Sequence, residues 1–406
     1  MLFRSHSKTL TRAPEALRNS ARSWSAPVLW RYGISMTSLE AWKAVPFHFW
    51  TGVFFVFGCI TGSFLNVCIH RMPLGQSVVS PPSHCPHCKY SIPWFLNIPL
   101  VTWLYLRGKC ANCRAPISPR YFLVELLAGL LFVGSWLVAG RSSPLLALVF
   151  CVLLSGLIVA TFIDFEHFII PDEITIGGLV VGFLLSWVVP AMHGVTTAKA
   201  ALQSSFFGML IGAGVVYAIL RIGKLVFGRE KVELAPGSRV VFTETALVLP
   251  GREILYEDVF YRKSDVITFE AHVVEMVDRC YKSVLIRLTP ERLQIGDETL
   301  EPEKVPHMEA ITDRMILPRE AMGLGDVKFM AAIGAFLGWK ATIFSLLLSS
   351  MIGALVGVTL IVMRRHEWSS RIPYGPYIAL AAVIWIFGGN RLLVWWLAWL
   401  NRGGLS

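Results

Sequence analysis

Two aspartates, far apart in the chain, are the residues best placed to do chemistry. Asp326 follows Gly323-Leu-Gly325 and opens an apolar run at Val327, and Asp164 closes an earlier apolar run. A carboxylate at the mouth of a hydrocarbon-length segment is costly unless it faces protein or water, so by default it marks a functional site. The two glycines before Asp326 remove side chains and permit positive φ, so a backbone or a substrate can approach closely.

A pair of facing carboxylates has a specific chemistry. Both cannot ionise cheaply, so one pKa rises and the pair holds a single proton. The ionised member can take a proton from water while the protonated member donates a hydrogen bond to a carbonyl oxygen, which is peptide hydrolysis without a metal. The pair should titrate as a unit, so neither aspartate is assigned as base or acid. The alternative is that Asp164 and Asp326 cap helices or pair with Lys328 or His167.

Further acidic residues follow Asp164. Asp172 comes directly after Pro171 and can cap the helix expected from Ile174, so it ranks below Asp164 for catalysis. Glu166 and His167 could tune the aspartate pair, although such residues are more often solvated loop. We therefore predict Asp164 and Asp326 as the catalytic residues. The supporting residues are Gly323, Gly325, Lys328, Glu166, His167 and Asp172.

Four cysteines form two CxxC pairs with 21 residues between them. The pairs are Cys85 with Cys88 and Cys110 with Cys113. This spacing suits one tetrahedral zinc held by four thiolates. Such a zinc has no open coordination position, so its role is structural, and it stabilises a loop too short for its own core. The alternatives are four reduced thiols, or a site partly served by His84 or His87.

Composition indicates a membrane protein. Of 406 residues, 54% are hydrophobic and 16% charged, and the mean hydropathy is +0.58. Several apolar runs approach the roughly 20 residues that cross a bilayer, which predicts an α-helical polytopic membrane protein with about eight transmembrane helices. These spans are Phe47–Ile69, Tyr121–Ala139, Pro144–Ile163, Ile174–Met192, Gln203–Leu220, Val327–Trp339, Ala341–Met363 and Pro376–Phe387. The net charge of +10 fits basic loops against anionic lipid, and no interleaving of basic and aromatic residues suggests nucleic acid.

The composition changes in residues 228–319. Of the 27 acidic residues, 18 lie between Arg229 and Glu320, and the chain alternates with period two between Pro-Gly pairs. This predicts an inserted small β-rich cytoplasmic domain. The full division is residues 1–45, a disordered or mis-assigned extension; 46–69, the first transmembrane helix; 70–120, a cytoplasmic zinc loop; 121–227, transmembrane helices 2–5; 228–319, the insertion; 320–390, transmembrane helices 6–8; and 391–406, an interfacial tail.

The zinc loop also predicts the orientation. Residues 70–120 hold six Lys or Arg and no Asp or Glu, so the positive-inside rule places them in the cytoplasm. Counting the spans onward puts Asp164 and Asp326 at the same cytoplasmic face. The extension falls on the outside with six Lys or Arg before Glu40, which disagrees with the rule unless translation starts at Met36.

The motifs together match a known family. They are Gly62–Val67 with Arg71–Pro73, the two CxxC pairs, Asn97–Pro99, Leu106–Gly108, Ile117–Tyr121 with Glu125, Asp164–Asp172, Gly323–Lys328 and Ile372–Pro376. In this order the chain resembles the bacterial type IV prepilin leader peptidases, membrane aspartic proteases of the GxGD type. The first 45 residues and the insertion do not match.

The resemblance implies a function. The family cleaves the leaders of type IV prepilins and pseudopilins after a glycine, on the cytoplasmic side of the bacterial inner membrane. Asp164 and Asp326 match its catalytic pair. Many members also N-methylate the new terminal residue with S-adenosylmethionine, an activity linked to the zinc loop, so we predict a methyltransferase too. No glycine-rich nucleotide fingerprint is present, so no residue is assigned to this cofactor.

Two other classes of function compete with this one. An ion-coupled transporter also uses intramembrane carboxylates, but it predicts them near mid-membrane and leaves the four cysteines unexplained. A non-catalytic membrane assembly factor would use the zinc loop and the β insertion for docking. Its function would survive loss of both aspartates.

Overall fold

The computed structural model describes residues 45–260, 263, 265–305, 307–318, 323–363 and 372–403. The predicted N-terminal extension lies outside these residues, apart from residue 45. The described chain divides into two compact units. One holds the residues up to His167, Leu185–Ala201 and those from Ala379 onward, and the other holds Phe168–Leu184 and Leu202–Ile378.

Within the described residues, six helical segments are long and apolar enough to cross a membrane. They are Phe47–Leu74, Pro119–Gly140, Pro144–His167, Ala198–Leu225, Leu324–Val362 and Gly375–Trp396. The chain is therefore a helical protein with several candidate membrane spans, as its composition predicted.

Two helices account for the difference between these six segments and the eight predicted spans. Helix α8 (Asp172–Val188) covers much of the fourth predicted span but has only 17 residues. Helix α11 (Leu324–Val362) runs through the sixth and seventh predicted spans as one 39-residue element. Inside it, Gly338 has φ 77° and ψ 174°, so the backbone turns there. This position directly precedes the predicted end of the sixth span at Trp339.

The last candidate span extends beyond the predicted end at Phe387 but is kinked there. Helix α12 (Gly375–Ile384) is followed by a π-helical turn at Trp385–Gly389 and by α13 (Asn390–Gly403). Inside the turn, Gly388 has φ 177° and ψ 3°, which is not helical, so α12 and α13 meet at a kink. The candidate span reaches Trp396 and so includes the first residues of the predicted interfacial tail, which follow this kink.

In the first unit, glycines bring helix α4 (Phe47–Arg71) close to helix α6 (Pro119–Ser135). A Cβ added at Gly62 would lie 2.7 Å from the Cα of Glu125, and one at Gly58 would lie 2.7 Å from the carbonyl oxygen of Ala128. Small residues at such crossings let helix backbones pack closely in a membrane. The third helix of this unit, α7 (Pro144–His167), is apolar along most of its length and carries Asp164 near its end.

In the second unit, helix α9 (Ala198–Phe227) packs in the same way on α11. A Cβ at Gly208 would lie 2.2 Å from the carbonyl oxygen of Gly334, and one at Gly212 would lie 2.6 Å from that of Met330. The Ser205 hydroxyl donates to the carbonyl oxygen of Ala335 at 2.9 Å. These contacts fix the first half of α11, at whose start Asp326 lies.

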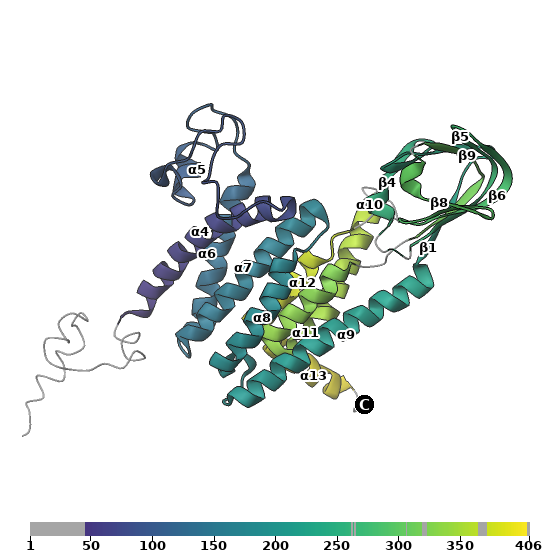
Figure 1. The fold of residues 1–406 in the computed structure, drawn as a ribbon. Coiled ribbons are helices and arrows are strands. Elements are labelled where there is room, and N and C mark those ends of the chain that lie inside the picture. Colours follow the sequence, from purple (N-terminus) through teal and green to yellow (C-terminus); the bar gives the residue numbers. More distant parts are fainter. Residues whose placement is uncertain are drawn as a thin grey trace, which may run out of the picture. The chain divides into compact units, whose positions relative to one another are not determined.

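A β-sheet region lies in the sequence between α9 and α11, as the alternating pattern predicted. Its ten described strands pair antiparallel in the order β4-β3-β2-β9-β5-β6-β7-β8, with β10 joining β5 to β1. The strands are β1 Arg229–Glu233, β2 Arg239–Phe242, β3 Ala246–Leu249, β4 Arg252–Leu255, β5 Ile267–Met276, β6 Cys280–Leu288, β7 Leu293–Ile295, β8 Glu298–Leu300, β9 Met308–Ile311 and β10 Arg314–Pro318. Figure 1 shows that the sheet is strongly curved, and the short helix α10 (Tyr256–Val259) follows β4.

The sheet buries a core of its own. Along β5, Ile267, Phe269 and Ala271 are buried, whereas Glu270 between them is exposed. Side chains of successive strand residues point to opposite faces, so the buried set lines one face. The core also takes in residues from β2, β3, β6, β7, β9 and β10.

Candidate functional site

Asp164 is buried in the last turn of α7. Its exposed fraction is 5%, although Glu166 and His167 in the same turn are exposed. Glu166 forms an ion pair with Arg120, in the first turn of α6. A buried carboxylate is costly unless it has polar partners. The buried Asp164 therefore differs in its environment from the exposed Glu166.

Asp326 is buried in the first turn of α11, with an exposed fraction of 9%. The first N–H groups of a helix have no partner within the helix, and its dipole favours a negative charge there. A Cβ added at Gly323, the residue before the helix, would lie 3.7 Å from Oδ2 of Asp326. The carboxylate of Asp326 therefore turns back toward the glycine.

The glycines beside Asp326 provide room rather than unusual backbone angles. Gly323 has φ −75°, and Gly325 lies inside the helix, so neither adopts the positive φ that glycine permits. A Cβ at Gly325 would lie 3.5 Å from the Cβ of Ile170 and 3.6 Å from its backbone nitrogen. These are ordinary van der Waals distances. The absent side chains thus keep open the space around the Asp326 carboxylate and beside Ile170.

Asp172 and Lys328 form an ion pair within the second unit. Nζ of Lys328 lies 2.6 Å from Oδ1 of Asp172, and both side chains are substantially exposed. Helix α8 begins at Asp172, and the carbonyl of Pro171 accepts from the N–H groups of Ile174 and Thr175. The predicted cap at Asp172 before a helix from Ile174 was therefore misplaced. Asp172 instead links the start of α8 to the start of α11.

The four cysteines of the CxxC pairs come together. Their sulfur atoms all lie within 4.8 Å of one another, with Cys85 and Cys113 3.8 Å apart and Cys88 and Cys110 4.0 Å apart. His84 instead lies 3.0 Å from the carbonyl oxygen of Pro82, and neither His84 nor His87 belongs to the cluster. The arrangement can hold a metal ion through four sulfurs.

Two similar turns build the cysteine cluster. In the first, the N–H of Cys85 donates to the carbonyl of Tyr90, and Lys89 has φ 58°. In the second, the N–H of Cys110 donates to the carbonyl of Ala115, and Arg114 has φ 61°. Each CxxC is thus followed by a left-handed residue that turns the chain back, so that the next residue accepts a hydrogen bond from the first cysteine.

Backbone hydrogen bonds favour ionised sulfur at two of the four cysteines. The backbone N–H of Tyr90, with a smaller contribution from the Asn112 side chain, lowers the pKa of Cys88 to about 6. The pKa of Cys110 is also lowered, first by the backbone N–H of Cys113 and then by that of Asn112. Because the thiolate is the form that ligates metals, these donors favour metal binding at Cys88 and Cys110, whereas the pKa of Cys113 in the same cluster is raised to about 11, against the effect of a backbone hydrogen bond at Ala115.

The segment that carries the cysteine cluster, residues 72–118, is called the cysteine loop. It is held by buried polar residues that were not among the predicted site residues. Glu125 in α6, 8% exposed, accepts a 2.7 Å hydrogen bond from the N–H of Leu100, whose φ is 61°. Arg71 at the end of α4 donates to the carbonyls of Ser77 and Pro81 at 3.0 and 2.8 Å. Asn66 donates to the carbonyl of Tyr121 at 3.0 Å. For Glu125 the sequence contained a signal of this role, because a lone acidic residue in an apolar span needs a polar partner.

Comparisons with known proteins agree across most of the chain. Residues 56–139 match the model of the bacterial peptidase A24 N-terminal domain, and residues 151–247 and 305–358 match that of the type IV leader peptidase family. The latter match skips residues 248–304, within the sheet region. No solved structure matches.

Curated relatives match as well. The prepilin leader peptidase/N-methyltransferase of Aeromonas hydrophila is 29% identical over 88% of this chain and 97% of its own length. The protein of the same name from Myxococcus xanthus is 39% identical over 50% of this chain and 56% of its own. The type 4 prepilin-like proteins leader peptide-processing enzyme of Escherichia coli is 38% identical over 43% of this chain and 68% of its own.

Proposed function

The chain belongs to the type IV leader peptidase family, and from this we propose that it is a prepilin leader peptidase and N-methyltransferase. Its substrates are type IV prepilins and pseudopilins, which carry a basic leader before an apolar helix. The cut follows a glycine at the end of the leader. S-adenosylmethionine then supplies a methyl group to the new N-terminal residue.

Asp164 and Asp326 together carry out the cleavage. The observation that carries this assignment is that both carboxylates are buried at the end of an apolar helix, while Glu166 and Asp172 nearby are exposed. The pair shares one proton. Its ionised member removes a proton from water, and its protonated member donates a hydrogen bond to the carbonyl oxygen of the scissile bond. Collapse of the tetrahedral intermediate returns a proton to the leaving amine.

The supporting residues act around this pair. The room beside Gly323 and Gly325 admits the extended substrate backbone. The Asp172–Lys328 ion pair holds the start of α11, and with it Asp326. The Arg120–Glu166 ion pair holds the end of α7, and His167 lies next in sequence at the edge of the site.

Zinc is the metal that the four-cysteine cluster fits best. The sulfurs of Cys85, Cys88, Cys110 and Cys113 would hold it, since thiolates in two CxxC pairs are the ligands of structural zinc. When bound, zinc cross-links residues 70–120 and takes no part in cleavage. Residues 70–120 then present the methyltransferase site.

The chain lies in the bacterial inner membrane with both sites on the cytoplasmic side. Eight crossings follow if α8 spans in addition to the candidate spans and α11 is counted as two helices that meet at Gly338. The positive loop of residues 70–120 fixes the orientation. The insertion of residues 228–319 is then cytoplasmic, and the partners are the prepilins and lipid, with no nucleic acid.

A cleavage assay tests the catalytic pair. Asp164→Asn and Asp326→Asn should each lower the rate of prepilin processing at least about 1000-fold, because each removes half of an acid–base pair. Glu173→Gln is the matched control, since it changes an exposed acidic residue outside the supporting set, and it should keep most of the activity. Near-normal processing by either of the first two variants would show that the pair is wrongly assigned. Such a result would favour the assembly factor or the transporter.

A further inference from the structure

The sheet region contains a cavity that the proposed reaction does not use. It has a volume of about 570 Å³ and is lined by residues of β2, β6, β7, β9 and α10 and of the segments that follow β2, β6 and β8. Most of its lining falls within residues 248–304, which the family model skips. Pockets of 300–1000 Å³ with mostly apolar walls and a few polar groups are typical of ligand sites.

The inner wall of the cavity is apolar and aromatic. Leu288 and Met308 belong to the buried core of the sheet and form its floor. The rings of Tyr256 and Phe260 lie with their centroids 5.7 Å apart, both half-buried. Burial raises the pKa of Tyr256 to about 12, so its hydroxyl stays protonated and can donate or accept a hydrogen bond. This wall would take up an aliphatic or aromatic side chain.

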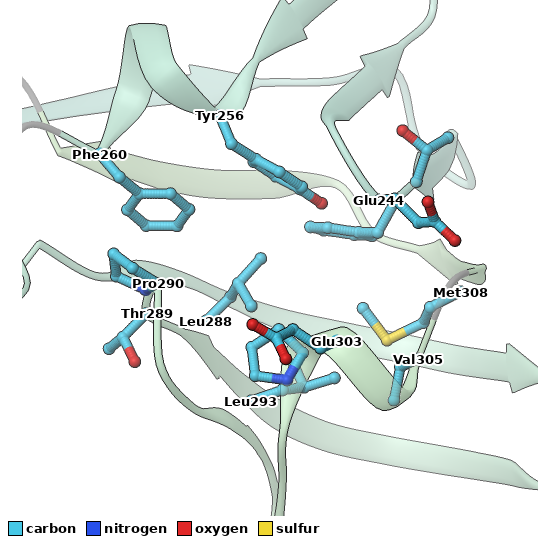
Figure 2. Close-up of a pocket in the computed structure, with 13 residues that line it drawn as sticks. Glu244, Tyr256, Phe260, Leu288, Thr289, Pro290, Leu293, Glu303, Val305 and Met308 are labelled. Carbon is cyan, nitrogen blue, oxygen red and sulfur yellow. The ribbon is translucent and has the colours of Figure 1, made fainter.

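The polar lining is acidic. Glu244 and Glu303 are exposed at the rim, and the lining contains no Lys or Arg. In Figure 2, Tyr256 and Glu244 lie on one side of the space and Leu288 and Glu303 on the other. Glu244 and Glu303 have no ion-pair partner among the described residues, whereas acidic residues nearby do, such as Glu291 with Lys263 and Glu301 with Lys304.

The charge of the whole region has the same sign. Residues 229–318 contain 17 Asp or Glu and 12 Lys or Arg, a net charge of −5. The remaining residues contain 10 Asp or Glu and 25 Lys or Arg, a net charge of +15. A field of one sign around a concave site attracts ligands of the opposite charge. The region is therefore suited to a cationic ligand in a chain that is otherwise basic.

The sheet edges favour a peptide over a small cation. Among the described strands, β4 pairs only with β3 and β8 only with β7, so each presents one unpaired row of N–H and C=O groups. Tyr256 directly follows β4, and Pro302 and Glu303 follow β8, so both edges end at the cavity. An extended peptide can bind such an edge through its backbone while alternate side chains enter a pocket.

We propose that this cavity is a binding site for a peptide segment in which basic and apolar residues alternate. Its apolar side chain enters between Tyr256, Phe260 and Leu288, and its cations lie against Glu244 and Glu303. This site lies in the sheet region, apart in sequence from the aspartates and the cysteine cluster. The inference does not depend on the proposed peptidase activity, since binding alone is measured.

The test uses the full chain in phosphatidylcholine nanodiscs and a fluorescent, end-blocked hexapeptide, Lys-Phe-Lys-Leu-Lys-Phe. Empty nanodiscs supply the background. Glu244→Gln combined with Glu303→Gln should weaken binding about tenfold, as expected for loss of two exposed ion pairs. Glu233→Gln combined with Glu275→Gln removes the same charge from exposed residues of β1 and β5, outside the cavity and away from the β4 and β8 edges, and it should change affinity less than twofold.

Two further readouts make the outcome decisive. The charge-inverted peptide Glu-Phe-Glu-Leu-Glu-Phe should bind at least tenfold more weakly than the basic one, and high salt should weaken the basic peptide through screening. Equal affinity of the two double variants, equal affinity of the two peptides, or no binding above empty nanodiscs would each overturn the proposal. A prepilin cleavage assay on the same preparations reports the peptidase activity separately.

Discussion

Two regions outside the candidate spans are held together in different ways. The sheet between α9 and α11 buries a core of apolar side chains from most of its strands. In residues 72–118, which join α4 to α6, only Cys85, Gly108 and Cys110 are buried. The sheet carries its own hydrophobic stabilisation, whereas the cysteine loop has its four-cysteine cluster and hydrogen bonds to polar residues of α4 and α6.

Loss of a cysteine ligand should have the largest effect. Cys85→Ser or Cys110→Ser should remove the zinc, because binding to such sites contributes about 10 kcal/mol or more to folding. We expect about one zinc per chain in the wild type and none in either variant, with the loop becoming sensitive to protease. Cys280→Ser, on strand β6, is the control and should keep its metal. A metal-free wild type, or a Cys85→Ser variant with full zinc, would contradict the zinc assignment.

A substitution that opens a cavity in the sheet core should destabilise the sheet without affecting the cysteine loop. Ile286→Ala removes a fully buried side chain and should lower the free energy of unfolding of the sheet by about 2–5 kcal/mol. Protease resistance of the sheet and zinc content, measured on the same sample, report the two regions independently. Thr299→Ala, at an exposed position on β8, should change neither. Release of zinc from the Ile286→Ala variant would mean that the regions are coupled.

Substitution of Glu125, the buried glutamate that holds the cysteine loop, should have a smaller effect on stability. Glu125→Ala leaves the N–H of Leu100 without its acceptor and should cost about 1–3 kcal/mol. Hydrogen exchange of the peptide containing Leu100 should speed up, while exchange in the sheet stays unchanged. Glu125→Gln retains an acceptor oxygen and should recover most of the protection. Unchanged exchange in the Glu125→Ala variant would remove this residue from the account of the loop.

The smallest effect is expected from the exposed ion pair between Arg120 and Glu166. Its Glu166 side chain is 43% exposed, so the coupling free energy should be below about 1 kcal/mol. A double-mutant cycle with Arg120→Ala and Glu166→Ala, followed by thermal unfolding, measures it. A coupling well above this value would indicate that the pair links the start of α6 to the helix that carries Asp164 more strongly than its exposure suggests.

Sequence reasoning identified the features that depend on pattern. The alternation of apolar and polar residues predicted the sheet between two apolar helices, and the CxxC spacing predicted the cysteine cluster. Both signals are local, since period and spacing directly determine which side chains share a face or a turn.

Features that depend on contacts between distant residues were missed. Nothing local in the sequence showed that Asp172 would meet Lys328 rather than cap its own helix. The cavity beside Tyr256 is lined by residues that are far apart in the sequence, from Phe242 to Met308, so no short motif predicts it.

The most direct test of the whole account is mass spectrometry of a pilin N-terminus after incubation with this protein and S-adenosylmethionine. Given full-length prepilin, the wild type should yield the shortened, singly methylated product, and Asp164→Asn and Asp326→Asn should leave the precursor intact. Given a pilin whose leader has already been removed, both aspartate variants should still add the methyl group. Cleavage that persists in either aspartate variant would contradict the central claim.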